Sequence, residues 1–237
     1  METVFHKANT RGHANHGWPD TYHTFSFGNY YDAGRMHFGA LRVLNDDRVE
    51  AGKGFGTHPH DNMEIISIPL EGDLEHKDSM GNKAVIKQGD IQVMSAGTGV
   101  FHSEYNLNKD QAVKFLQIWV FPNRKDMEPR YDQLSIRDIE QANQFNQILS
   151  PRKEDQGVWI HQDAWFHIGN FEAGKSSSYS LNSEANGVYI FLLEGELEVD
   201  GQLMEKRDGM GIKGANEITF TSSKSSRVLL MEVPIKY

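Results

Sequence analysis

The sequence predicts an all-β protein built from two stacked antiparallel β-barrels with little helix. Short runs of β-branched and aromatic residues, separated by glycine-containing turns, dominate the chain, and a segment repeats in its second half. Many short strands with regular turn signals are typical of sandwiches and barrels. After a first short run at residues 4–5, the clearest candidate strands are residues 24–27, 63–68, 91–94, 115–120, 188–193, 217–220 and 228–233.

The repeat predicts two domains of one architecture. Residues 71–75, Glu-Gly-Asp-Leu-Glu, recur as residues 194–198, Glu-Gly-Glu-Leu-Glu. Each copy follows an apolar run and precedes a polar turn and a glycine that opens another run. A five-residue match alone could be a common hairpin turn, but the matching flanks favour duplication. We therefore expect an N-terminal domain at residues 1–130 and a C-terminal domain at residues 144–237.

The connection between the two domains is expected at residues 128–143, where a proline occurs and the period-two pattern is lost. Residues 135–142 are the best helical candidate of the chain. Ser135 could cap its N-terminus, with Asp138 three residues later in a pattern close to a capping box.

Composition excludes several classes of function. The net charge of the 237 residues is −9, with 24 basic and 33 acidic residues and no run rich in lysine or arginine, which argues against nucleic acid and anionic membranes as partners. Cysteine is absent, so disulfides, thiolate metal ligands and a cysteine nucleophile are excluded. The first residues lack a signal-peptide pattern and the apolar runs are too short to cross a bilayer, so we expect a cytoplasmic protein.

Two closely spaced pairs of polar residues predict a metal site. His58 and His60 are two positions apart in a region that reads as strand, so both imidazoles project from one face. His102 and Glu104 form a second such pair, just after the glycine turn at residues 96–99. If the two strands face each other across a barrel, three neutral imidazoles and one carboxylate meet.

This set of nitrogen and oxygen donors suits Fe, Mn, Ni, Cu, Co or Zn. Four protein ligands on a six-coordinate ion leave two positions open, as catalysis requires. A lone His-x-His is weak evidence, because histidine is common in partly buried strands. The other histidines are expected at the surface or loosely packed, namely His6, His13, His16, His23, His37, His76, His161 and His167. His76 in particular is expected at a solvated strand end and not as a ligand.

The spacing of these residues resembles the two cupin motifs. These read Gly52-x5-His58-x-His60-x3-Glu64 with Gly72, and Gly89-x7-Gly97 leading to His102. Two departures occur: seven residues separate Glu64 from Gly72 instead of six, and Ser95 replaces a proline while His102 comes two residues late. Both departures fit pirins, which the chain resembles over nearly its whole length. The resemblance rests on residues 58–60, 70–72, 75–79, 89–94, 96–99, 102–104, 116–120 and 128–131, with 23–27 and 29–32 like bacterial members and 161–164 like shorter ones.

The resemblance implies a bicupin, with two cupin (jelly-roll) domains and one metal ion, commonly Fe(II), in the N-terminal one. Its ligands would be His58, His60, His102 and Glu104, whereas Glu64, a ligand in many cupins, would be structural or support the ligands. A repeat offset of 123 places Leu181, Ser183 and Gly187 where His58, His60 and Glu64 stand. We therefore expect a metal-free C-terminal domain that packs against or covers the first.

Some pirins cleave the flavonol quercetin with O2, and others are regarded as regulatory partners of transcription factors. The first function predicts that a flavonol 3-hydroxyl binds the metal and that Glu104 takes its proton, with Phe55 lining the substrate pocket. The alternative is a metal-binding regulatory or sensor protein with an unidentified protein partner. The ligands also allow a zinc-dependent isomerase or hydrolase, because a fold does not fix chemistry.

Overall fold

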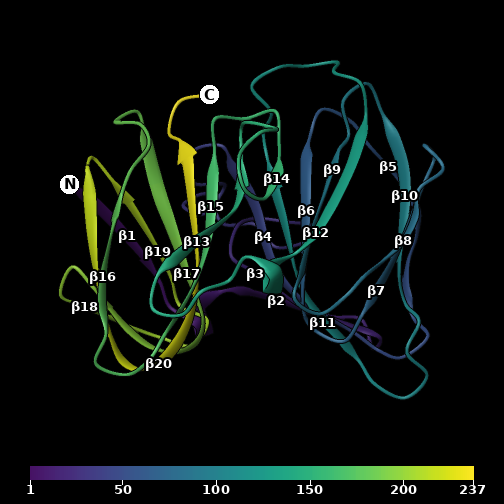
Figure 1. Ribbon diagram of the computed structural model, residues 1–237. Helices are drawn as coiled ribbons and strands as arrows, with labels where there is room; N and C mark the ends of the chain where they lie inside the picture. Colours follow the sequence, from purple (N-terminus) through teal and green to yellow (C-terminus); the bar gives the residue numbers. More distant parts are fainter.

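The computed structural model describes residues 1–237 and confirms the all-β fold (Figure 1). Apart from two short 3-10 turns, η1 (Ala8–Thr10) and η2 (Ile136–Asp138), the regular elements are strands. The first half contains β1 (Glu2–His6), β2 (Gly12–Asn15), β3 (Pro19–His23), β4 (Leu41–Val49), β5 (Gly54–His60), β6 (Glu64–Glu71), β7 (Leu74–Asp78), β8 (Lys83–Ile86), β9 (Asp90–Ser95), β10 (Val100–Asn106), β11 (Val113–Val120) and β12 (Arg130–Ser135). The second contains β13 (Phe145–Ser150), β14 (Val158–Trp159), β15 (Trp165–Phe171), β16 (Ser176–Ser180), β17 (Asn186–Val199), β18 (Gln202–Glu205), β19 (Gly209–Lys213) and β20 (Glu217–Pro234).

The N-terminal barrel is formed by two sheets that face each other. A seven-stranded sheet has the order β12-β9-β6-β11-β4-β3-β2, and a four-stranded sheet has the order β5-β10-β7-β8. Figure 1 shows this barrel on the right and the nine-stranded C-terminal sheet, which includes β1, β17 and β20, on the left. The structure contains no helix with the length and apolarity that a membrane span requires.

Four expectations about elements differ from the structure. Residues 1–130 were expected to form the N-terminal domain, but strand β1 pairs with β19 of the C-terminal sheet. The chain therefore begins in the C-terminal half, and the limits of the two domains stay a prediction. Much of the expected connection is strand β12, which pairs with β9. The helix expected at residues 135–142 is a single 3-10 turn, and the side chain of Ser135 makes no capping hydrogen bond. Residues 24–27 form no strand, because the chain turns there and buries Phe25 in the core.

The repeated turn has the same backbone role in both halves. Gly72 follows the apolar part of β6 with φ 71°, and Gly195 lies at the equivalent place in β17 with φ 86°. This left-handed conformation favours glycine, which explains why the repeat retains it. Strand β6 lies between β9 and β11, as β17 lies between β19 and β20.

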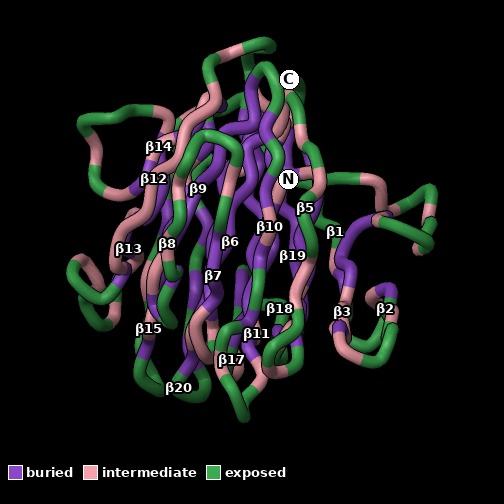
Figure 2. Tube along the Cα trace, turned by 90° about the vertical axis from the view of Figure 1, so that its right-hand side faces the viewer, coloured by how far each residue is buried: buried purple, intermediate pink, exposed green.

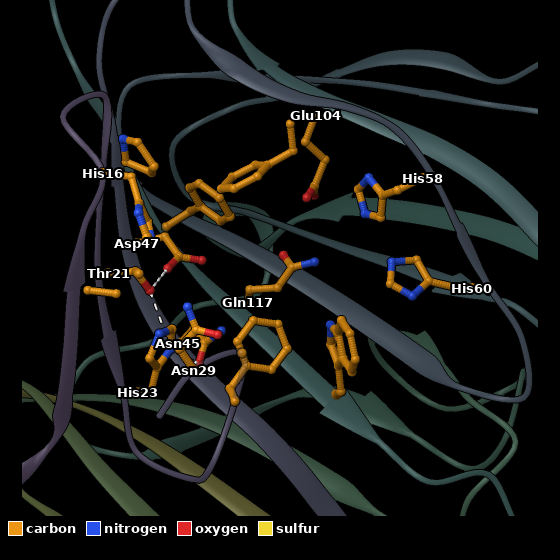
Figure 3. Close-up of a pocket in the computed structure, with 17 residues that line it drawn as sticks. His16, Thr21, His23, Asn29, Asn45, Asp47, His58, His60, Glu104 and Gln117 are labelled. Atoms are coloured by element: carbon orange, nitrogen blue, oxygen red, sulfur yellow. Dashed lines mark hydrogen bonds between the residues drawn. The ribbon is translucent and has the colours of Figure 1, made fainter. Parts of the chain in front are cut away.

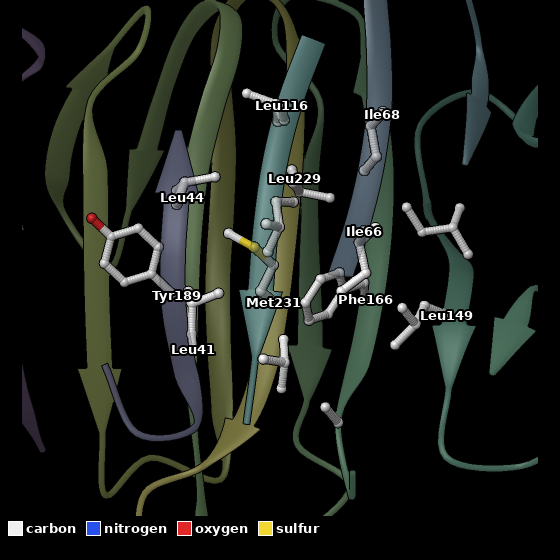
Figure 4. Close-up of a cluster of buried hydrophobic side chains, with 14 of the residues drawn as sticks. Leu41, Leu44, Ile66, Ile68, Leu116, Leu149, Phe166, Tyr189, Leu229 and Met231 are labelled. Atoms are coloured by element: carbon white, nitrogen blue, oxygen red, sulfur yellow. The ribbon is translucent and has the colours of Figure 1, made fainter. Parts of the chain in front are cut away.

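One hydrophobic core joins the two barrels. The outer face of the seven-stranded sheet supplies Leu44, Ile66 and Leu116, which pack against Phe166 and Leu229 of the C-terminal half (Figure 4). This cluster contains 26 buried residues from both halves and is larger than any core within one barrel. The barrels are therefore stacked through a continuous apolar interface.

The inner face of the same sheet is polar at one level. Five neighbouring strands each contribute one polar residue, and each of these lies directly opposite the next across the sheet. We call them the polar row: His23 on β3, Asn45 on β4, Gln117 on β11, Ser67 on β6 and Gln92 on β9. All five are buried, because alternate residues of each strand face the barrel interior. The β2–β3 hairpin extends this sheet at the edge of the molecule (Figure 2). The polar row therefore runs from the hairpin toward the candidate metal centre.

Candidate metal centre and its pocket

Strand pairing brings the predicted histidines together. Strands β5 and β10 are antiparallel neighbours, with His58 directly opposite His102. A register shift follows, so that Glu104 is opposite Phe55 and β5 contains one extra residue. The ring centroid of His102 lies 4.4 Å from that of His58 and 4.9 Å from that of His60. One nitrogen from each of the three rings lies within 4.8 Å of the others.

The backbone orients the ring of His58. Its Nδ1 lies 2.8 Å from the carbonyl oxygen of Gly56, close enough to donate a hydrogen bond. This bond leaves Nε2 free to bind an ion, and a carbonyl partner of this kind commonly fixes the tautomer of a metal-bound histidine.

Unpaired nitrogens show that the cluster fits a cation. His60 Nε2 and both ring nitrogens of His102 are buried and have no hydrogen-bond partner in the chain. Buried polar atoms are normally hydrogen-bonded, so these unsatisfied nitrogens need an explanation, and each ring can turn one nitrogen toward a shared ion. Burial lowers the pKa of His60 to about 4 and the pKa of His102 still further, with the neighbouring histidines adding to both shifts. The rings are therefore neutral near pH 7, the form that binds metals.

Glu104 supplies the carboxylate of the site. It is buried, and its Oε1 lies 3.0 Å from Ser67 Oγ, which also lies 2.9 Å from Gln117 Oε1. The hydroxyl has one proton and donates to one of these acceptors at a time. Burial raises the pKa of Glu104 to about 7, which the bond from Ser67 opposes. A nearby cation would favour the ionised form.

His76 is not at a solvated strand end, and that expectation was wrong. Its side chain is fully buried on β7, opposite Glu104 on β10. His76 Nε2 lies 3.1 Å from Asp78 Oδ2, and its ring centroid lies 5.4 Å from that of His102. The carboxylate of Glu104 and nitrogens of His76 and His102 lie within 4.8 Å of one another. His102 thus belongs to two overlapping groups, and whether His76 is a ligand stays a prediction.

Three further histidines are buried, against expectation. His6 accepts or donates a hydrogen bond with the Tyr189 hydroxyl at 2.8 Å, His23 pairs with Asn45, and His167 lies beside Tyr179 in the C-terminal barrel. Their sequence contexts contain polar neighbours, and only the tertiary packing shows the burial. The remaining four lie at least partly exposed, as predicted: His13, His16, His37 and His161.

Glu64 lies outside both groups of candidate ligands. It is buried, and its Oε2 accepts a 2.6 Å hydrogen bond from Ser95 Oγ. Burial raises its pKa to about 7, while the hydrogen bond and the charge of Arg130 oppose the shift. Its role as a structural residue or a support for the ligands stays a prediction.

A pocket of about 310 Å³ opens onto the cluster (Figure 3). His58, His60 and Glu104 line one end, and Phe55, for which the sequence predicts a substrate contact, also lines the pocket. The opposite end was missed from the sequence. It is lined by Thr21, His23, Asn29, Asn45 and Asp47. The period-two spacing of the pairs 21/23 and 45/47 was the available signal, since alternate strand residues share a face.

Two β-barrels in tandem, with a histidine and glutamate cluster of this kind in the first, define a bicupin. The family model described as pirin matches residues 4–120, and that described as quercetinase C-terminal cupin domain matches residues 147–233. The chain belongs to the pirin family, and the resemblance drawn from its motifs is confirmed.

Relatives and solved structures agree with this assignment. The chain is 44% identical over 228 residues to a quercetin 2,3-dioxygenase of Escherichia coli K12, covering 96% of this chain and 97% of the relative. A pirin-like protein of Caulobacter vibrioides is 36% identical, with 93% and 95% covered. The crystal structure of YhhW from Escherichia coli superposes with a TM-score of 0.94 at 40% identity over 100% of both chains. Bacterial pirin YhhW in complex with nickel(II) gives 0.93 at 41% identity, covering 98% and 99%.

Proposed function

We propose that this protein is a metal-dependent dioxygenase that cleaves flavonols such as quercetin with O2. The single observation that carries the proposal is the group of neutral histidines with unpaired nitrogens, next to a buried carboxylate, at one end of an aromatic-lined pocket. The name of the relative with 44% identity supports the same reaction.

His58, His60, His102 and Glu104 are the proposed ligands of one divalent ion per chain. Fe(II) is our first choice, and Mn, Ni, Cu, Co and Zn fit the same donors. The nickel complex of YhhW supports a site of this type that accepts a divalent transition metal. When bound, the ion would act as a Lewis acid that lowers the pKa of a coordinated hydroxyl.

Glu104 is the proposed general base. One of its carboxylate oxygens takes the proton of the flavonol 3-hydroxyl, while the hydroxyl of Ser67 donates to Oε1 and holds the carboxylate in place. Phe55 and Trp119 line the pocket beside the cluster and would hold the flat ring system against the histidines. Their apolar surface also keeps water away from the reacting ring, which favours cleavage by O2 over side reactions.

The test is oxygen uptake and the decay of flavonol absorbance under air, with metal-loaded protein. Glu104→Gln keeps the shape and one oxygen donor but loses the charge, so we expect turnover to fall by roughly 10²–10⁴-fold while metal content is largely kept. The exposed Glu198 supplies a control, Glu198→Gln, that should match the unchanged protein.

Two outcomes would count against this function. If the Glu104→Gln protein retains metal and full turnover, Glu104 is only a ligand and the proposed base is wrong. If the unchanged protein, fully loaded with Fe(II), turns over no flavonol, the metal-binding regulatory function replaces the dioxygenase.

A further inference from the structure

The pocket has two polar ends separated by aromatic side chains. At one end are the candidate ligands His58, His60 and Glu104, and at the other lie Thr21, His23, Asn29, Asn45 and Asp47 (Figure 3). Phe27 and Trp119 connect the two ends, because ring contacts run from His23 through Phe27 and Trp119 to His60. Phe55, Phe115 and Gln117 of the polar row also line the pocket. A ligand that reaches both ends must be flat and apolar in the middle and polar at both extremities.

The remote end contains a carboxylate with free hydrogen-bonding capacity. Asp47 is 7% exposed, and its Oδ1 accepts a hydrogen bond from the hydroxyl of Thr21. No side chain or backbone group donates to its Oδ2, which points toward Gln117 and the middle of the pocket (Figure 3). The Asp47 residue is largely buried while its Oδ2 faces the pocket, so a ligand that places a donor there gains a hydrogen bond. Burial raises the pKa of Asp47 to about 7, and the bond is charge-assisted when the carboxylate is ionised.

The neighbouring groups define the chemistry of that ligand. His23 Nδ1 lies 2.9 Å from Asn45 Oδ1, so these two side chains are already paired with each other. No lysine or arginine lines the pocket, so an acidic ligand would have no cationic partner there. Aromatic walls bind a flat ring, and the remaining acceptor suits a neutral hydroxyl on that ring.

We propose that the pocket end formed by Thr21, Asn45 and Asp47 is a hydroxyl-recognition subsite. Asp47 Oδ2 accepts a hydrogen bond from a phenolic hydroxyl on the ring of the substrate that lies farthest from the metal-binding group. Thr21 holds the carboxylate in position through its bond to Oδ1. The proposal rests on the proposed flavonol function. It makes Asp47 the residue that selects polyhydroxylated flavonols over flavonols whose single hydroxyl is the 3-hydroxyl.

The competing explanation is that Asp47 only fastens β3 to β4. Thr21 and Asp47 are directly opposite in that strand pair, so their hydrogen bond also ties the hairpin to the sheet. A structural role would lower stability and weaken the binding of every ligand equally. A recognition role would change the ratio of affinities between ligands that differ only in hydroxyl groups.

The test compares quercetin with 3-hydroxyflavone, which has the same metal-binding 3-hydroxyl and carbonyl but no other hydroxyl. Dissociation constants are measured without oxygen on the metal-loaded full chain, from the change in flavonol absorbance. We expect a preference for quercetin that Asp47→Asn and Asp47→Ala each reduce by roughly tenfold, the value of one charge-assisted hydrogen bond. Galangin lacks only the hydroxyls of ring B. If it binds as weakly as 3-hydroxyflavone, the contact with Asp47 is made by ring B, and if it binds as tightly as quercetin, the contact is made by ring A.

The control is Asp20→Asn on the same hairpin, since Asp20 does not line the pocket. It should leave the quercetin preference unchanged, and metal content and melting temperature are compared for all variants. An unchanged preference in both Asp47 variants overturns the subsite, as does an equal loss of affinity for both flavonols or no flavonol binding at all. Oxygen uptake is read separately: binding with the expected preference but no turnover rejects the dioxygenase and keeps the subsite.

Discussion

His102 is the residue on which the candidate metal centre depends most, because it belongs to both groups of potential ligands. We expect His102→Ala to lose most of the bound metal while the fold stays intact, since the hydrophobic clusters of the molecule include none of the proposed ligands. Elemental analysis after reconstitution with Fe(II) should fall from one equivalent per chain to well below one, with an unchanged circular dichroism spectrum. Two equivalents in the unchanged protein would contradict the single site.

His76 provides the matched comparison at the same site. Its Nε2 is engaged with Asp78, while its buried Nδ1 has no hydrogen-bond partner. Because nitrogens of His58, His60 and His102 form one group without it, we expect His76 to support the ligands and not to bind the ion. His76→Ala should then retain a full equivalent of metal but bind it roughly 10–100-fold more weakly, as is typical for residues that orient ligands. Loss of the metal comparable to that in His102→Ala, measured by competition with a chelator, would make His76 a ligand.

His167 links burial to acid stability. Burial lowers the pKa of His167 from 6.5 to about 4. At pH values between 4 and 6.5 the imidazole therefore binds a proton in the unfolded chain but not in the folded chain. The stability contributed by the neutral ring is complete above pH 6.5 and is lost as the pH falls toward 4. At pH 5 we expect His167→Phe to recover about 2 kcal/mol of this loss in the free energy of unfolding.

Urea denaturation of both proteins at pH 7 and pH 5 measures this effect, because packing differences cancel when the two pH values are compared. The exposed His16 supplies a control, His16→Phe. A pH dependence identical in the His167→Phe and unchanged proteins would show that the ring is not protected from protonation in the folded state.

At this scale the sequence predicted one end of the pocket and missed the other. The pairs 58/60 and 102/104 were recognisable because two-residue spacing alone aligns side chains on a strand. His76 was misjudged because Glu75, Lys77 and Asp78 surround it with charge, whereas Asp78 lies inside the barrel as its partner. Asp47 meets Thr21 only through strand pairing across more than twenty residues, which a linear motif does not express.

Among the elements, the turn before β10 is the one that positions the cluster. Gly97 has φ 47°, and a Cβ there would collide with the carbonyl of Met127. Gly52 also has positive φ, at 68°, but a Cβ there would meet open space. We expect Gly52→Ala to cost about 1–2 kcal/mol of unfolding free energy from backbone strain alone, and Gly97→Ala to cost clearly more.

Thermal unfolding of the two variants checks this difference, and metal content reports whether β10 has moved. Equal melting temperatures for Gly97→Ala and Gly52→Ala would mean that the turn absorbs the added methyl group, and that it does not constrain β10.

The strands were predicted correctly where apolar runs with period-two character occur. The prediction failed where tertiary contacts determine the local structure. Strands β6, β9, β11, β17 and β20 follow from apolar runs with period-two character. Residues 135–142 carry a capping pattern, but Ile136 is drawn into the interface between the barrels and only one turn forms. Local propensity is a weak prior that such packing overrides.

For the whole molecule, the shared core predicts cooperative unfolding of the two barrels. Phe166 of the C-terminal half is fully buried in the cluster that includes Leu44 and Ile66 of the N-terminal half. We expect one calorimetric transition, raised by added metal as the folded state binds it. Phe166→Ala should lower the melting temperature of that single transition, with a loss of about 3–5 kcal/mol. Two transitions, of which metal raises one, would show that the barrels unfold independently.

The polar row has a consequence for how the sheet finds its correct pairing. A slip of one residue between neighbouring strands is excluded by the hydrophobic pattern, because it would turn the apolar side chains of the interface into the barrel. A slip of two residues returns every side chain to its proper face, so hydrophobicity does not exclude it. Such a slip would separate Ser67 from Gln117 and His23 from Asn45. Each buried polar group left without a partner costs about 1–3 kcal/mol, so residues that shape the pocket also make the correct alignment the most stable one.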